Sequence, residues 1–213
     1  MKEDQFIPAF SYDFLTPFYD FFVNLLFGYK ERAKIVKLLN LKEGELLLDV
    51  GCGTGTLLVV AKKLHPTNKM TGIDIDDRIL KYAQKKINKE NLDIKIIKAS
   101  AAKLPFDNSS FDVVVSTFTF HHLPTAVKKQ SLKEIKRVLR RGGRFLLIDF
   151  GRAEGFWMNF LYALEKLFHI KEADTLKDNI EGKLPLLLKQ GGFNVKEVAP
   201  KYRGIQHLLA TTD

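Results

Sequence analysis

The segment Leu46–Gly55 constrains the fold of this chain more than any other stretch of its sequence. It has the pattern of an apolar strand that ends in an acid, followed by a turn through three alternating glycines and a helix that begins near Thr54. A strand, a glycine-rich loop and a helix in this order typically hold a nucleotide-like ligand at the carboxyl edge of a parallel sheet. The glycines let the backbone turn tightly and approach the ligand closely.

The acid before the loop indicates which kind of ligand the loop would hold. Dinucleotide-binding loops follow the pattern G-x-G-x-x-G and place a pyrophosphate on the helix N-terminus. Here the third glycine comes one residue early, and Asp49 stands two residues before the loop, where its carboxylate would repel a phosphate. The pattern argues against an NAD-dependent oxidoreductase and favours a ligand with a positive ammonium and no phosphate, such as S-adenosylmethionine.

Four motifs occur in an order and spacing that one protein family shares. They are Asp49–Gly55, Thr71–Ile75, Ala101–Phe106 with Ser110–Asp112, and Arg137–Arg144. Together they resemble the motifs of class I S-adenosylmethionine-dependent methyltransferases, over roughly residues 30 to 150. Tyr19-Asp20, with Phe27-Gly28 downstream, is faintly similar to the N-terminal region of the ubiquinone and menaquinone C-methyltransferases.

This resemblance implies a set of cofactor-binding residues. They are Asp49, Gly51, Cys52, Gly53, Thr54, Gly55, Asp74, Ile75, Ser100, Ala101, Ser116 and Thr117. Asp49 would lie near the ammonium, and Asp74 would accept hydrogen bonds from both ribose hydroxyls. Ser100 stands where many relatives have an Asp that contacts the adenine amino group, and serine is a shorter, uncharged acceptor. Ser116 and Thr117 would line the floor near the methyl group.

The alternation of strand and helix patterns predicts an α/β fold, with helices on both faces of a parallel sheet. We expect strands at 45–50, 69–74, 93–98, 112–117, 143–149, 193–199 and 204–211, and helices at 30–41, 54–65, 76–89, 125–141, 155–170 and 174–190. The resemblance completes this as a Rossmann-like, doubly wound, seven-stranded, mostly parallel sheet with a C-terminal antiparallel strand pair. We expect residues 1–43 to form an N-terminal helical lid or substrate segment, and residues 44–213 the methyltransferase domain.

Composition limits the partners and the compartment. The net charge of +9 is typical of a lysine-rich soluble surface, with an anionic membrane surface as the alternative. Nucleic acid is disfavoured, because Ser116–Phe120 replaces the Asn/Asp-Pro-Pro-aromatic motif of base-methylating relatives. Cys52 is the only cysteine, and Glu3 and Asp4 stand where a secretory signal would be basic. We therefore expect a cytoplasmic protein without a transmembrane span.

Methyl transfer from a sulfonium requires alignment of donor and acceptor, and for some acceptors also a base. His121 follows the fourth strand, in a stretch similar to the H-H-L of many relatives, and Asp149 ends the fifth. These two are the candidate catalytic residues, although the histidine could equally pack locally and the acid could cap the next turn. The candidate substrate residues are Tyr12, Tyr19, His122 and Arg152. No metal site is predicted, because no third ligand lies near the two histidines in sequence.

The apolar residues between 156 and 168 cover more of a helix than one core-facing stripe needs. With the Phe-rich N-terminus, they indicate an apolar pocket or a membrane-facing surface, and core packing or a homodimer interface is the alternative. The sequence therefore predicts methyl transfer to a small, apolar, quinone- or lipid-like acceptor. A phospholipid or other metabolite N- or O-methyltransferase and a non-catalytic cofactor-binding module stay open as alternatives.

Overall fold

A computed structural model of the chain describes residues 29–152, 172–202 and 204–212. Tyr12, Tyr19 and the expected helix at 155–170 lie outside these residues. Within the described part, no helix has both the length and the apolar character needed to cross a bilayer.

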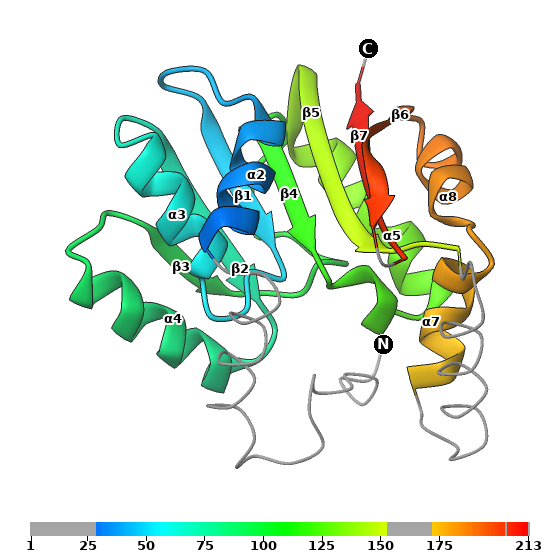
Figure 1. Cartoon of the computed structure of the whole chain (residues 1–213), viewed down its shortest axis with the longest axis horizontal. Helices are drawn as coiled ribbons and strands as arrows, with labels where there is room; N and C mark the ends of the chain where they lie inside the picture. Colours follow the sequence, from blue (N-terminus) through cyan, green and yellow to red (C-terminus); the bar gives the residue numbers. More distant parts are fainter. Residues whose placement is uncertain (1–28, 153–171, 203, 213) are drawn as a thin grey trace.

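Seven strands form one sheet in the order β3-β2-β1-β4-β5-β7-β6 (Figure 1). They are β1 (Leu46–Val50), β2 (Lys69–Asp74), β3 (Lys95–Lys98), β4 (Phe111–Thr117), β5 (Leu139–Phe150), β6 (Asn194–Tyr202) and β7 (Ile205–Thr211). Strands β1 to β5 run parallel, whereas β7 is antiparallel to both β5 and β6. The predicted mostly parallel sheet with a C-terminal antiparallel pair is therefore confirmed.

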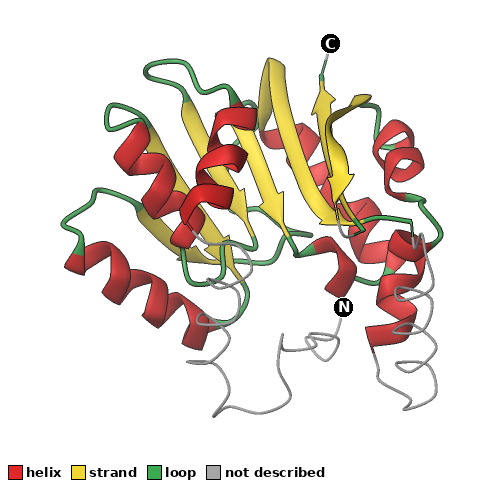
Figure 2. Cartoon of the chain, in the orientation of Figure 1, coloured by secondary structure: helices red, strands yellow, loops and turns green. Residues whose placement is uncertain are grey.

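Helices cover both faces of the sheet (Figure 2). One face carries α2 (Tyr29–Leu39), α3 (Thr56–Leu64) and α4 (Asp77–Lys89), and the other carries α5 (Thr125–Val138) and α8 (Leu184–Gln190). The centre of β4 explains this arrangement. Val113 and Val115 point into one hydrophobic core and Val114 into the other, and all three are fully buried. A continuously apolar strand suits burial on both faces.

Two short elements lie where the parallel strands end. The 3₁₀-helix η2 (Phe120–His122) follows β4, and α7 (Glu172–Ile180) packs against it and against β5. Both lie at the lower edge of the sheet in Figure 1. This edge is where a doubly wound sheet binds its ligands.

The structure corrects three of the expected helices. Helix α3 begins two residues late, because the glycine turn continues through Gly55, which has a φ of +69°. Helix α5 ends at Val138, because the backbone is already extended at Leu139, where β5 begins. The single helix expected at 174–190 is two helices, since Gly182 adopts a φ of +71° between α7 and α8.

Helix α2 belongs to the core of the sheet domain. Its residues Ile35, Val36 and Leu39 are buried in the same hydrophobic cluster as Leu47 of β1 and Leu58 of α3. The described part of the 1–43 segment is therefore packed as one layer of the domain.

Candidate active site

The sheet has its topological switch point between β1 and β4. From β1 the chain proceeds outward to β2 and β3, and from β4 it proceeds the other way to β5. In a doubly wound sheet, the ligand crevice lies at this point, outside the carboxyl ends of the strands. Asp49 and Asp74, close to or at the ends of β1 and β2, and Asp149, next to the end of β5, meet this edge. The structure thus brings the three predicted acids to one side of the sheet.

Asp49 carries a carboxylate that the described residues leave without a partner. The residue is 1% exposed, and neither side-chain oxygen accepts a hydrogen bond from any described residue. Burial, and to a lesser extent the charge of Asp74, raises the pKa of Asp49 to about 8. A buried carboxylate without a partner is unfavourable. This position is therefore suited to a ligand that brings a positive charge.

Asp74 organises the glycine loop. Its Oδ2 accepts a hydrogen bond from the backbone N–H of Gly53 at 2.9 Å, and its Oδ1 accepts one from the N–H of Asp76 at 3.0 Å. Burial raises the pKa of Asp74, and these backbone donors oppose the rise. Gly53 has a φ of +53°, and nothing described lies within 4 Å of the place where a Cβ would stand. The loop is therefore open beside Asp74.

Gly51 permits a close approach between the two loops of the crevice. It has a φ of +77°, and a Cβ there would come within 2.1 Å of Thr119 Oγ1, in the loop after β4. Cys52 is buried beside Gly72 of β2, where an added Cβ would come within 2.8 Å of its sulfur, and burial raises the pKa of its thiol. Both positions serve the packing of the loop.

The other predicted cofactor residues differ in how their side chains are used. Ile75 follows Asp74 and is 40% exposed, which is unusual for an apolar side chain at a sheet edge. Ser100 Oγ accepts a hydrogen bond from the N–H of Ala102 at 3.2 Å. Ser116 is fully buried and donates its hydroxyl to the carbonyl oxygen of Val50 at 2.7 Å. The Ser116 hydroxyl therefore links β4 to β1, whereas Thr117 is half-buried at the strand end.

His121 and Asp149 form a hydrogen-bonded pair on the β4–β5 side of the crevice. His121 Nδ1 lies 2.8 Å from Asp149 Oδ1, and the histidine side chain is 14% exposed. Asp149 Oδ2 accepts hydrogen bonds from the backbone N–H groups of Phe120 at 2.8 Å and His121 at 3.3 Å. The carboxylate therefore both caps η2 and orients the imidazole. In the tautomer with Nδ1–H directed at Asp149, the free lone pair of the ring would be on Nε2.

The two predicted substrate residues that the structure describes differ in exposure. Burial, followed by the charge of His121, lowers the pKa of His122 to about 4, so this imidazole is neutral near pH 7. Its ring centroid lies 3.9 Å from that of His121. Arg152 is exposed at the end of a described range.

Sequence reasoning missed two buried residues that fix α7 beside this pair. Asn179 of α7 is fully buried and donates its side-chain amide to Asp149 Oδ1 at 3.2 Å and to the carbonyl oxygen of Phe150 at 2.9 Å. Lys128 of α5 is also fully buried, and its ammonium lies 2.6 Å from the carbonyl oxygen of Thr175 and 3.4 Å from Asp178 Oδ2. No motif marks these residues, because the contacts of Asn179 cross 30 residues to β5, and those of Lys128 cross about 50 residues from α5 to α7.

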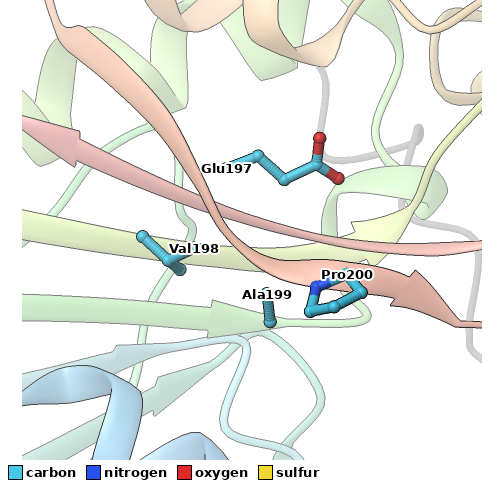
Figure 3. A pocket seen from close by; sticks show the side chains of 4 residues that line it. All are labelled: Glu197, Val198, Ala199 and Pro200. Atoms are coloured by element: carbon cyan, nitrogen blue, oxygen red, sulfur yellow. The ribbon is translucent and has the colours of Figure 1, made fainter.

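A shallow hollow of about 620 Å³ lies elsewhere, on the edge strand β6. Glu197, Val198, Ala199 and Pro200 line it (Figure 3). None of these is a predicted site residue. Among the described residues, no group of three His, Cys, Asp or Glu side chains is arranged to hold a metal ion.

Comparison with known proteins agrees with this geometry. Residues 47–143 match a family model described as a methyltransferase domain. A solved S-adenosylmethionine-dependent methyltransferase from Aquifex aeolicus is 25% identical, with a TM-score of 0.65, over 86% of this chain and 90% of its own. Over the matched residues 47–143 the chain carries a methyltransferase domain, and its fold, its glycine loop and the two acids beside the loop are similar to those of class I S-adenosylmethionine-dependent methyltransferases.

Within that class, the chain is similar to a group of curated quinone-modifying enzymes. It is 36% identical to a demethylmenaquinone methyltransferase from Lactobacillus johnsonii over 63% of this chain and 57% of that protein. It is 34% identical to one from Listeria welshimeri over 56% of this chain and 51% of that protein. The chain thus spans about half the length of these curated relatives.

Proposed function

We propose that this protein transfers the methyl group of S-adenosylmethionine to a quinone-like, apolar acceptor. The cofactor supplies the methyl group as an electrophile on a sulfonium. The acceptor class follows from the demethylmenaquinone methyltransferases to which the chain is similar.

The observation that carries this proposal is the unpartnered carboxylate of Asp49. Both of its buried oxygens lack a hydrogen-bond donor among the described residues. The ammonium of a bound amino acid would supply donors and charge together, at the switch point where the fold binds ligands. Asp74 at the end of β2 would meet the ribose, and Ile75 would present its exposed side chain to the base. The residues present therefore fit the cofactor.

The pair of His121 and Asp149 supports a base on the acceptor side. An aromatic diol becomes a stronger nucleophile when it loses a hydroxyl proton, and His121 Nε2 is the acceptor for that proton. Asp149 stabilises the imidazolium that results, because its oxygen lies 2.8 Å from Nδ1. Asp149 is fully buried. We therefore assign His121 as the base and Asp149 as a positioning residue.

Calorimetric titration with S-adenosylmethionine, S-adenosylhomocysteine and NAD tests the cofactor. We expect micromolar binding of the first two and none of NAD, and binding of NAD alone would refute the proposal. Incubation with labelled S-adenosylmethionine and a short-chain demethylated naphthoquinol then tests the acceptor. Phospholipid and small amine acceptors belong in the same panel, because transfer to one of those would redirect the acceptor assignment. Cofactor binding without any transfer would favour a non-catalytic module.

A lipid-like acceptor resides in a bilayer, so we extend the proposal to a cytoplasmic protein that contacts membranes peripherally. The net charge of +9 would favour anionic lipid headgroups. Sedimentation with vesicles of anionic or purely zwitterionic lipid tests this contact, and equal recovery with both would argue against an electrostatic contribution. Light scattering on the same preparation reports whether the protein is a homodimer.

A further inference from the structure

An acid and an arginine of helix α5 hold the loop that follows β3. Arg137 makes two hydrogen bonds to Glu134, with Nε 2.9 Å from Oε1 and Nη2 2.8 Å from Oε2. It also donates to the carbonyl oxygens of Leu104 at 3.0 Å and Phe106 at 2.7 Å. Glu134 Oε2 in turn accepts a hydrogen bond from the N–H of Leu104 at 2.8 Å. We call Glu134 and Arg137 the loop clamp.

The loop clamp fixes one end of a tight turn at the carboxyl edge. Residues 100–103 form this turn, in which the N–H of Lys103 donates to the carbonyl oxygen of Ser100 at 3.0 Å. Leu104 follows directly, and both of its backbone polar groups are bound by the clamp. The other end is fixed by the N–H of Ala99, which donates to the backbone carbonyl of Asp74 at 3.0 Å. Hydrogen bonds therefore hold the turn to β2 at one end and to α5 at the other.

This turn stands where the base of a nucleoside would lie. A ligand with its ammonium at Asp49 and its ribose at Asp74 extends along the sheet edge from β1 toward β3. Beyond Asp74, the exposed Ile75 and the turn after β3 are the next groups on that path. The polar edge of the base would therefore meet the backbone and the hydroxyl of the turn, and recognition would depend on their exact placement.

We propose that Glu134 and Arg137 are positioning residues that set the purine selectivity of the cofactor site. Neither residue touches the base. Both act through Leu104, which holds the turn in the one conformation that matches adenine. This inference rests on the cofactor placement proposed above.

The chain provides a matched control for the clamp. Arg144 makes the same kind of double hydrogen bond to Glu45, at 2.9 and 2.6 Å, and donates to the carbonyl oxygens of Leu39 at 2.7 Å and Asn40 at 2.6 Å. In each pair the hydrogen bond from the arginine lowers the pKa of the glutamate, so both acids are ionised near pH 7. The Arg144 pair lies at the opposite, amino edge of the sheet and ties the end of α2 to the start of β1.

The experiment compares Arg137→Lys with Arg144→Lys, because lysine keeps the charge but cannot form the planar double hydrogen bond. Binding of S-adenosylhomocysteine and of S-inosylhomocysteine is measured by calorimetry. In the second ligand a ring carbonyl replaces the adenine amino group. We expect the unaltered protein to bind S-adenosylhomocysteine more tightly than S-inosylhomocysteine. Arg137→Lys should lower the affinity for S-adenosylhomocysteine about tenfold and the affinity for S-inosylhomocysteine much less. Arg144→Lys should lower Tm and leave both affinities unchanged.

Glu134→Gln guards against a folding defect, because it keeps the size of the side chain while it removes the charge and replaces one acceptor oxygen by a donor. It should show the same reduced preference for adenine at a smaller loss of Tm. If the Arg137 and Glu134 variants lose affinity for both ligands equally, the inference is overturned. It is also overturned if the unaltered protein shows no preference for adenine. Neither result would contradict the proposed function. Failure of the unaltered protein to bind either ligand would overturn the proposed function and this inference with it.

Discussion

The proposed site has a cofactor half at the ends of β1 and β2 and an acceptor half at the ends of β4 and β5. Each half contains a buried acid, but the two acids differ in their hydrogen bonds. Asp49 and Asp149 are both buried acids on central parallel strands of the sheet, 1% and 0% exposed. Asp49 has no hydrogen-bond donor among the described residues, whereas Asp149 accepts from the ring of His121, the amide of Asn179 and three backbone N–H groups. A buried acid that accepts hydrogen bonds holds the donor groups in place, whereas a buried acid without donors can still accept hydrogen bonds from a ligand. On the proposed assignment, the cofactor half awaits donors that its ligand would supply, whereas the hydrogen bonds of the acceptor half are already formed.

Exchanging each acid for its amide tests this comparison most directly. Asp49→Asn should weaken S-adenosylhomocysteine by about a hundredfold or more, because the buried ammonium loses its counter-charge. The Tm of the free protein should change little, since no described donor is lost. Asp149→Asn should do the reverse and lower Tm with nearly unchanged affinity, because the amide nitrogen would face donors. Calorimetry and thermal unfolding of both variants provide the check, and similar behaviour of the two would remove the distinction.

Removal of the imidazole tests the acceptor half alone. His121→Ala should reduce kcat about a hundredfold, which is the usual contribution of a general base, and leave cofactor affinity unchanged. His65→Ala is the control, because His65 is the C-cap residue of α3, at the opposite edge of the sheet from His121. Initial rates with a naphthoquinol acceptor at saturating cofactor measure the effect. A loss of Tm that accounts for the whole loss of rate would assign His121 a structural role.

The raised pKa of Asp49 predicts that the affinity for the cofactor depends on pH. Its pKa of about 8 in the free protein lies above the ordinary 3.8, so the carboxyl is protonated at pH 6 and must lose a proton to bind an ammonium. Affinity should therefore rise about tenfold per pH unit between pH 6 and 7 and level off above pH 8. Calorimetry in buffers of different ionisation enthalpy measures the released proton. Asp49→Asn should abolish both the pH dependence and the proton release.

The same carboxyl makes the stability of the free protein depend on pH in the opposite direction. Because the folded pKa is raised, the neutral form stabilises the folded state fully below pH 4, and this contribution is lost as pH rises through about 8. The Tm of the free protein should therefore fall from pH 6 to pH 9, and S-adenosylhomocysteine should restore more of it at pH 9 than at pH 6. A rise of Tm with bound ligand that is equal at both pH values would contradict the assignment.

The contrast between the halves also explains what the sequence could predict. Asp49, Gly51 and Gly53 are nearly contiguous, and strand and helix periodicity places the loop between them at a sheet edge. The support of Asp149 on β5 comes partly from Asn179, which is 30 residues away on helix α7. The loop clamp could be predicted from the sequence only in part. Arg137 belongs to a visible motif, but its partners at Leu104 and Phe106 are set by tertiary packing.

The smallest predicted effect concerns Asn179 of α7, which donates a hydrogen bond to Asp149 in the acceptor half. Asn179→Ala removes one donor to Asp149 Oδ1 and leaves four others, so we expect kcat to fall only several-fold. Asn68→Ala is the matched control, because Asn68 is equally buried and donates its amide to the carbonyl oxygens of Lys42 and Glu45, at the other edge of the sheet.

Nitrogen NMR of the histidine rings distinguishes positioning from simple destabilisation. In the unaltered protein His121 should carry its proton on Nδ1, facing Asp149, and Asn179→Ala should mix the two tautomers as the carboxylate loses its fixed orientation. Asn68→Ala should lower Tm by a similar amount and leave the tautomer unchanged. If both variants leave the His121 signal alike, then the hydrogen bond from His121 to Asp149 is sufficient by itself, and the acceptor half is held by η2 and β5 without help from α7.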